Sequence, residues 1–240
     1  MLKACLNGDR PARERVPVTP SALALAALEA VQAGADALHV HPRGDLGRES
    51  LDVDLIVAAL AAIRAAVPGV RVGVSTHAGI CPDPVQRLAL VREWIGPHEG
   101  GPDFASVNWH EDGAVEVARV LRARGIGVEA GLFTPAAAST FVATRWPWQV
   151  ERVLVEAIPG VSPGGYGEWA VERILAALGS VPTPVLVHGE GRWAWPVLRW
   201  AQRRGYATRI GLEDSLVDEA GRRVESSAEL VRAALAVPGR

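Results

Sequence analysis

Cysteine is scarce in this chain: Cys5 and Cys81 are the only two among 240 residues. Two cysteines cannot build the disulfide framework of a small secreted protein, and we expect a reduced, cytoplasmic protein. Long hydrophobic runs are missing as well, since no apolar segment approaches the about 20 residues that cross a bilayer. The first residues, Met1 to Leu6, lack the charged lead and cleavage pattern of a signal peptide, so no membrane association is expected.

Neither sign of charge is in excess, because 25 lysine and arginine residues nearly balance 27 aspartate and glutamate residues. The formal net charge of -2 offers no electrostatic attraction for nucleic acid or for an anionic membrane surface. No linker, block of like charge or low-complexity tract interrupts the chain. Residues 1–240 are therefore expected to form a single domain.

Short apolar segments alternate with amphipathic segments along the whole chain. The expected strands are 2–7, 35–41, 70–75, 104–108, 127–132, 153–158, 184–188 and 207–212. The expected helices are 20–33, 53–66, 84–94, 114–124, a short piece after Thr134, 168–178, 192–204 and 226–236. Strands that are each followed by a helix predict an α/β fold, a parallel (β/α)8 TIM barrel, which commonly takes about 250 residues. A doubly wound open sheet is the alternative.

Each expected strand carries polar side chains on the face opposite its large aliphatic residues. If the aliphatic residues face the helices, the polar ones face the barrel interior, near the end where barrel enzymes hold their active sites. These inward residues are Asn7, His39, His41, Ser75, Ser106, Asn108, Glu129, Glu156, His188, Arg209 and Glu213. A barrel without a function would have little reason to collect buried polar groups at one end, so an active site is expected there.

Two of these residues, His39 and His41, are two positions apart and therefore point the same way from one strand. Glu213, from the last strand, can reach them across one intervening strand. Two imidazoles and one carboxylate suit Zn²⁺ and leave a fourth position for water or substrate. Another divalent transition metal also fits this ligand set. The alternative is a pair of hydrogen-bonded histidines and a glutamate paired with Arg209.

Arg209 has two interpretations. As a buried guanidinium it needs a partner, and a salt bridge with Glu213 or Asp214 would supply one. It could instead orient and electrostatically tune Asp214, or bind a substrate carboxylate through its planar fork.

Further polar residues leave alternatives open. The hydroxyls of Ser75 and Thr76 could bind a carboxylate together with backbone N–H groups, or could cap the next helix. Glu129 and Glu156 could bind an amine or act as a base, or could pair with an arginine inside the barrel. His77 is expected to be a surface or loop histidine and not a ligand.

Five motifs, in the same order along the chain, resemble the family of β-keto acid cleavage enzymes. They are Asn7-Gly8, Pro17-Val18-Thr19-Pro20, His39-Val40-His41-Pro42-Arg43, Ser75-Thr76 and Arg209-Ile210-Gly211-Leu212-Glu213-Asp214. The likeness extends from the first expected strand to the last expected helix. The first histidine motif and the last motif are specific in combination, and neither would be so alone.

The resemblance implies a zinc-dependent barrel that condenses a β-keto acid with acetyl-CoA. The products would be acetoacetate and a new acyl-CoA, formed through an enolate and a retro-Claisen step. By this likeness His39, His41 and Glu213 hold the metal. Asp214, paired with Arg209, takes the proton between the ketone and the carboxylate.

The resemblance also implies a substrate-binding set. Ser75 and Thr76 would hold the substrate carboxylate, Asn108 lies at the same rim, and Glu129 would contact the far end of some substrates. A homo-oligomer, a tetramer or a dimer, is expected.

Three features depart from the family pattern. The chain is shorter than most relatives, His77 stands where relatives usually carry glycine, and His188-Gly189-Glu190-Gly191 is unlike the usual ending of the seventh strand. The acidic residue that relatives carry after the first strand corresponds to Asp9 or to Glu14.

Two other functions remain open. An amidohydrolase-like metal hydrolase also uses two histidines in this spacing, but on the first strand and with later histidine ligands, for which only His188 is available here. A non-catalytic metabolite-binding barrel is the second alternative. The presence of both the metal ligands and Asp214 argues against it, because binding alone would not require a metal and a base together.

Overall fold

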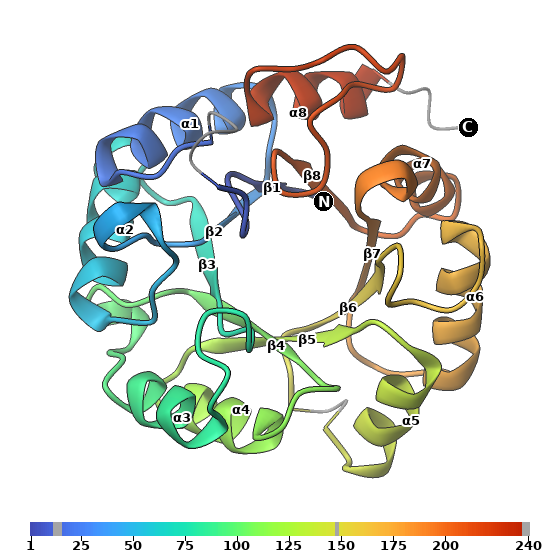
Figure 1. Cartoon of the computed structure of the whole chain (residues 1–240), viewed down its shortest axis with the longest axis horizontal. Helices are drawn as coiled ribbons and strands as arrows, with labels where there is room; N and C mark the ends of the chain where they lie inside the picture. Colours follow the sequence, from blue (N-terminus) through green and yellow to red (C-terminus); the bar gives the residue numbers. More distant parts are fainter. Residues whose placement is uncertain (12–15, 147–148, 237–240) are drawn as a thin grey trace.

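The apolar segments form one parallel eight-stranded sheet in the computed structural model of the chain, which describes residues 1–11, 16–146 and 149–236. The strands are β1 Leu2–Cys5, β2 Ala37–Val40, β3 Arg71–Ser75, β4 Phe104–Asn108, β5 Gly127–Leu132, β6 Arg152–Ala157, β7 Val185–Gly189 and β8 Thr208–Gly211. Their order is β7-β6-β5-β4-β3-β2-β1-β8. A parallel bridge between Leu186 and Ala207 joins the two edges, so the sheet closes into a nearly complete barrel (Figure 1). The predicted TIM barrel is confirmed, and the open sheet is excluded because β1 lies between β2 and β8.

The helices surround this barrel as an outer ring (Figure 1). They are α1 Pro20–Gln32, α2 Val53–Ala66, α3 Pro84–Arg92, α4 Ala114–Ala123, α5 Pro135–Ala143, α6 Gly167–Leu178, α7 Ala194–Arg203 and α8 Ser227–Ala236. Short 3-10 helices occupy Asp45–Gly47, Pro97–Glu99 and Gly191–Trp193. In the described part of the chain no helix has both the length and the apolar character to cross a membrane.

Several helices begin where the local sequence satisfies their first backbone N–H groups. Thr19 accepts a hydrogen bond from the backbone of Ala22, and Pro20 follows it in the first turn. Asp83 caps α3 and Thr134 caps α5 in the same way, each also followed by proline. Proline suits the first turn because its missing N–H is not needed there.

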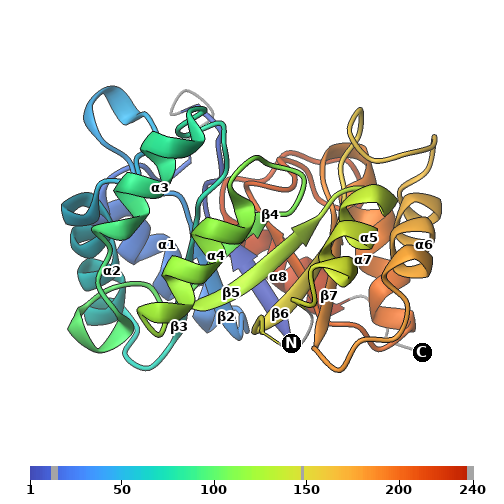
Figure 2. The ribbon, with the colours of Figure 1, turned by 90° about the horizontal axis from the view of Figure 1, so that it is seen from below.

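The alternation along β1 shows how the strands divide the molecule into two layers. Leu2 and Ala4 pack in the hydrophobic core between the sheet and the helices. Lys3, which is fully buried, faces the barrel interior instead and reaches Glu129 of β5. Figure 2 shows the same layers from the side, with the helices lying along the outside of the strands.

Three strands that carry predicted site residues end earlier than the sequence predicts. β1 ends at Cys5, β2 at Val40 and β8 at Gly211, so that Asn7, His41 and Glu213 lie just beyond them. The chain leaves the hydrogen-bonded ladder there to enter the loops at the mouth of the barrel. Similarly, α3 ends at Arg92 and not at Trp94.

Candidate active site

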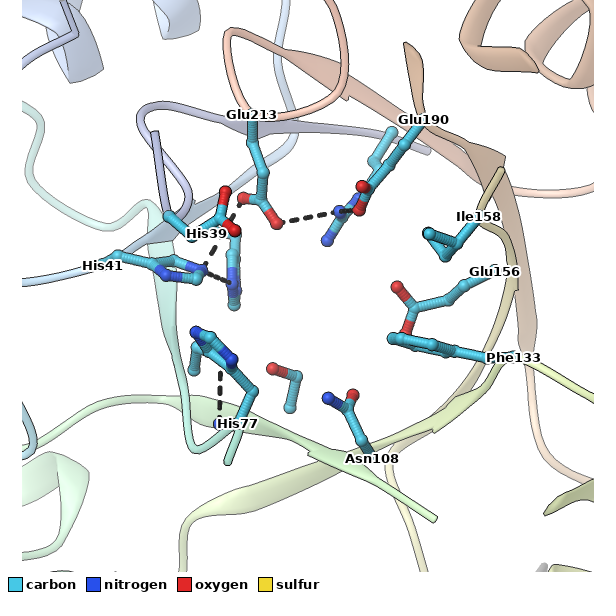
Figure 3. Close-up of a pocket in the computed structure, with 13 residues that line it drawn as sticks. His39, His41, His77, Asn108, Phe133, Glu156, Ile158, Glu190 and Glu213 are labelled. Atoms are coloured by element: carbon cyan, nitrogen blue, oxygen red, sulfur yellow. Dashed lines mark hydrogen bonds and ion pairs between the residues drawn. The ribbon is translucent and has the colours of Figure 1, made fainter. Parts of the chain in front are cut away.

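A cavity of about 220 Å³ lies at the carboxyl ends of the strands. It is mostly polar, and its walls come from loops and strand ends all around the barrel (Figure 3). The lining residues are Asp9, His39, His41, Ser75, His77, Ser106, Asn108, Phe133, Glu156, Ile158, Glu190, Arg209 and Glu213. This is the end at which TIM-barrel enzymes place their chemistry.

Three of the lining residues lie close enough together to ligate one metal ion. The Nε2 atoms of His39 and His41 lie 3.1 Å apart, and Nε2 of His41 lies 3.8 Å from Oε2 of Glu213 (Figure 3). All three ligand atoms lie within 4.8 Å of one another. The structure therefore joins residues that the sequence separates by most of its length.

The backbone around these residues is held by neighbouring groups. The side chain of Asn7 makes two hydrogen bonds to the backbone of His41. Oδ1 of Asn7 accepts from the His41 N–H at 2.9 Å, and Nδ2 of Asn7 donates to the His41 carbonyl at 2.8 Å. Gly8 has a φ of +56°, and a Cβ built there would lie 2.3 Å from Cγ of Glu213. Only glycine at this position leaves room for the glutamate side chain.

Arg209 connects the acidic groups behind the cavity. Its Nη2 lies 2.9 Å from Oε1 of Glu213 and 2.9 Å from Oδ1 of Asp214. Its Nε donates to Asp214 at 3.1 Å and to Nδ1 of His188 at 3.1 Å. Both partners that the sequence offered for Arg209 are therefore engaged, and the guanidinium faces the cavity as well.

Burial and these charges set the protonation of the site. Burial lowers the pKa of His39 well below its ordinary value, and the neighbouring His41 lowers it further, so His39 is neutral at neutral pH. Burial alone would raise the pKa of Asp214, but Arg209 outweighs it and lowers that pKa. Asp214 is fully buried and does not line the cavity, and its Oδ2 has no hydrogen-bond partner among the described residues.

The four residues predicted to bind substrate are divided between two places. Ser75 and Asn108 line the cavity, and Nδ2 of Asn108 donates to Glu111 at 2.8 Å. The Thr76 hydroxyl does not line the cavity, because it donates to the Ser106 carbonyl at 2.7 Å.

Glu129 does not reach the cavity either, because its position on β5 lies deeper in the barrel. Its Oε2 lies 2.5 Å from the ammonium group of Lys3, and its Oε1 lies 2.6 Å from Arg152. Pairing inside the barrel, which the sequence left as an alternative to substrate binding, is what the structure contains.

Two residues near the metal ligands were missed or misjudged from the sequence. His77 was expected to be a surface or loop histidine; it lies in the loop after β3, and its half-buried side chain lines the cavity. Oε1 of Glu49 contacts Nδ1 of His41 and lies 3.1 Å from Nε2 of His77. Burial would raise the pKa of Glu49, but hydrogen bonds from His41 and His77 outweigh it and lower the pKa to about 2. Glu49 follows a loop and not a strand, so strand alternation gave no signal for it.

Three further acidic residues line the cavity. Asp9 is one, whereas Glu14, the other candidate for the acid after the first strand, lies outside the described residues. Glu156 lies 2.8 Å from Nε2 of His188. Burial, assisted by the negative charges of Asp214 and Glu213, raises the pKa of Glu190 to about 8.

The donor set at His39, His41 and Glu213 fits a divalent transition metal. Two nitrogens bound to a tetrahedral zinc, at 2.0–2.1 Å each, lie roughly 3.3 Å apart, close to the separation of the two Nε2 atoms. Oε1 of Glu213 is held by Arg209, whereas its buried Oε2 has no hydrogen-bond partner among the described residues. A free buried carboxylate oxygen beside two imidazole nitrogens is the arrangement that a cation completes.

Comparisons with known proteins identify a family and similar barrel structures. The sequence pattern of a family described as beta-keto acid cleavage enzyme matches residues 1–238. Among solved structures, the binary complex of ObcA with oxaloacetate is similar, with a TM-score of 0.69 and 17% identity. That match covers 90% of this chain and 62% of ObcA, so the chain spans less than two thirds of that relative's length.

Two further structures extend the comparison. A ternary complex of ObcA with a C4-CoA adduct and oxalate has a TM-score of 0.70, 19% identity and the same two coverages. A 3-hexulose-6-phosphate synthase from Salmonella typhimurium has a TM-score of 0.57 and 13% identity over 98% of both chains. At such low identities these structures show a shared barrel fold and no more.

Proposed function

The chain belongs to the beta-keto acid cleavage enzyme family, and on that premise we propose that it condenses a β-keto acid with acetyl-CoA. The proposed products are acetoacetate and a new acyl-CoA, formed through an enolate and a retro-Claisen step. The observation that carries the proposal is the convergence of His39, His41 and Glu213 beside Arg209 and Asp214 at one cavity. ObcA, captured with oxaloacetate and with a C4-CoA adduct, supports the same substrate classes by analogy.

His39, His41 and Glu213 would hold a divalent metal, zinc being the expected ion. A metal bound there would act as a Lewis acid on a substrate carbonyl. The neutral state of His39 suits this role, because only an unprotonated imidazole nitrogen can ligate.

Asp214 is proposed as the base and Arg209 as its partner. The proton between two carbonyl groups is already acidic, so a carboxylate held in place can remove it. Oδ1 of Asp214 is engaged by Arg209, whereas its Oδ2 remains available to accept a proton. Arg209 lines the cavity, so a substrate carboxylate or ketone placed against it would also lie near Asp214.

Ser75 and Asn108 are the proposed contacts for the substrate carboxylate, because both line the cavity that Arg209 also lines. Asn108 faces Glu213 across this cavity (Figure 3). Thr76 would contribute by fixing the strand end through its bond to the Ser106 carbonyl. Glu129 would support the barrel beneath the site instead of contacting the substrate, because both its oxygens are paired.

A second cavity, of about 730 Å³, adjoins the first and shares Asp9 with it. Its lining includes Arg43 and Arg48, and it is the proposed place for the acetyl-CoA that the reaction requires. We expect Arg48→Glu to raise the KM for acetyl-CoA while the KM for the keto acid changes little. Equal changes in both constants would place the cofactor elsewhere.

The alternative of an amidohydrolase-like hydrolase is less favoured. His188 is the later histidine that such an enzyme would need as a ligand, but Glu156 and Arg209 occupy its two ring nitrogens. The His188 ring is also absent from the possible metal groups among the described residues.

The test is a screen of β-keto acids with acetyl-CoA and Zn²⁺, in which acetoacetate and the new acyl-CoA are both measured. We expect both products, at equal rates, and loss of both when acetyl-CoA or the metal is removed. Hydrolysis without acetyl-CoA would favour the hydrolase instead. Asp214→Asn should retain bound metal and lose most of the turnover, and full activity of this variant would exclude Asp214 as the base.

The proposal includes the homo-oligomeric, cytoplasmic enzyme that the sequence predicts. Light scattering of the purified protein would distinguish a dimer or tetramer from a monomer.

A further inference from the structure

His41 differs from His39 in how its ring is held. Nδ1 of His41 contacts the carboxylate of Glu49, whereas the buried Nδ1 of His39 has no hydrogen-bond partner among the described residues. One of the two proposed histidine ligands is therefore fixed at its Nδ1 by a second side chain, and the other is not.

The hydrogen bonds around Glu49 determine which nitrogen carries the proton in two rings. The backbone N–H of Gly79 can only donate, and it lies 3.1 Å from Nδ1 of His77. Nδ1 of His77 therefore accepts, and its Nε2–H donates to Oε1 of Glu49 at 3.1 Å. An ionised carboxylate can only accept, so the proton shared with His41 lies on Nδ1 of His41.

A neutral His41 with its proton on Nδ1 has its lone pair on Nε2. That atom lies 3.1 Å from Nε2 of His39 and 3.8 Å from Oε2 of Glu213, on the side of the proposed metal. The chain of bonds from Gly79 through His77 and Glu49 thus presents the ligating nitrogen to the cavity.

The loop that carries Glu49 is itself fixed. Arg43 and Glu49 form an antiparallel bridge, and the N–H of Gly44 donates to the Arg48 carbonyl at 2.8 Å. The N–H of Ser50 donates to the Pro42 carbonyl at 3.0 Å. The chain folds back directly after the second histidine and returns Glu49 to it.

We propose that Glu49 and His77 are positioning residues that hold His41 in the tautomer whose Nε2 faces the metal site. The inference rests on the proposed function only in treating His41 as a ligand. A carboxylate bonded to the remote nitrogen of a ligating histidine orients the ring and raises its basicity, and its loss typically weakens metal binding about 10- to 100-fold.

The experiment is a titration of the metal-free full-length protein with Zn²⁺ against a chromophoric chelator, which gives stoichiometry and affinity without an activity assay. We expect one zinc per chain, and about 10- to 100-fold weaker binding in Glu49→Gln. His77→Ala should weaken binding in the same direction but less, because Glu49 still contacts His41. Matched controls are Glu93→Gln and His98→Ala, both at exposed positions, which should bind zinc as the unaltered protein does.

A second measurement does not depend on any variant folding. Ring ¹⁵N chemical shifts of the metal-free protein report which nitrogen of each histidine carries the proton. We expect Nδ1 to be protonated in His41 and Nε2 in His77. A proton on Nε2 of His41 would overturn the inference.

The titration separates failure of the inference from failure of the proposed function. Zinc binding by the unaltered protein, with Glu49→Gln folded and within twofold of it, would overturn the inference alone. A protein that binds no divalent transition metal would overturn both. A second zinc per chain that disappears in His77→Ala would also overturn the inference, because Glu49 and His77 would then be ligands of their own ion.

Discussion

The barrel interior contains two polar layers that differ in how completely their charges are paired. In the floor layer, defined as Lys3, Glu129 and Arg152, both oxygens of a fully buried carboxylate face a cation, at 2.5 and 2.6 Å. In the mouth layer, defined as His39, His41 and Glu213, two Nε2 atoms face each other and a buried carboxylate oxygen has no partner in the described chain.

Both layers come from inward positions of strands or of the residues just after them, so local sequence does not distinguish them. The layers differ in how many of their polar atoms have partners. A fully paired buried network stabilises one arrangement of the barrel, whereas unpaired donors and acceptors cost stability unless a further group completes them. We therefore propose that the floor layer stabilises the barrel and that the mouth layer binds a ligand.

The largest effect is expected on zinc affinity, when a residue of the mouth layer is replaced. His39→Ala removes one of three proposed ligands, and we expect zinc affinity to fall by more than the about 100-fold that loss of a supporting residue costs. Thermal stability of the metal-free protein should change little, because the substitution removes the unpaired buried Nδ1 together with the hydrogen bond between Nε2 of His39 and Nε2 of His41. Metal content and Tm of the same sample check this. Full zinc occupancy would show that His39 is not a ligand.

In the floor layer, a substitution should lower stability and leave zinc affinity unchanged. Glu129→Gln leaves the ammonium group of Lys3 buried without a counter-charge, and we expect a loss of about 3–5 kcal/mol in the free energy of unfolding. Zinc affinity should remain near its normal value. Urea denaturation together with the zinc titration measures both.

A double variant is the control for this interpretation. Adding Lys3→Met to Glu129→Gln removes the stranded charge and should recover most of the lost stability. A double variant as unstable as the single one would contradict the pairing argument.

Ser75 and Thr76 offer the same comparison, between a residue that lines the cavity and one that supports the barrel, at adjacent positions. Thr76→Val removes a hydrogen bond to the Ser106 carbonyl and should cost about 1 kcal/mol of stability, with the KM for the keto acid unchanged. Ser75→Ala should raise that KM with a smaller effect on stability, since Ser75 lines the cavity and its hydroxyl accepts a long hydrogen bond, from the His77 N–H at 3.3 Å. Chemical denaturation and steady-state kinetics of the two variants distinguish these roles, and a reversed pattern would exchange them.

The smallest effect is a pH dependence at the mouth. Burial raises the pKa of Glu190 to about 8, from an ordinary value of 4.5, so the folded chain keeps this proton where the unfolded chain has lost it. Stability from this group is present below about pH 4.5 and is lost as pH rises toward 8. Glu190→Gln cannot lose a proton, so its Tm relative to the unaltered protein should increase across this window. A constant difference between about pH 5 and pH 8 would contradict the raised pKa.

The fold and half of the site follow from local patterns. The alternation of apolar and polar residues predicted the inward set, and the spacing of His39 and His41 placed both on one side of the chain where β2 ends. Glu49 and His77 could not be found in this way. They reach His41 through loops, and loop conformation depends on long-range contacts such as the return of residue 49 to residue 43.

Asp214 and Glu129 show that local patterns also predict cavity residues that do not line the cavity. Both were predicted from motif position or strand face, but neither lines the cavity. Depth in the barrel decides which inward side chains reach open space, and depth depends on register with neighbouring strands. The pairing of Glu129 with Arg152 on adjacent β6 is a register contact.

The sequence by itself determined an eight-fold alternation of strand and helix, the inward face of each strand, and the residue types able to ligate a metal, because these depend on side-chain period and chemistry within a few residues. Only the tertiary structure decided that both oxygens of Glu129 are paired with cationic side chains, whereas Oε2 of Glu213 has no hydrogen-bond partner among the described residues. Closure of the barrel brings Lys3 to Glu129 and Glu213 to His41. Partners so distant in sequence are chosen by strand order and register, which no local pattern contains.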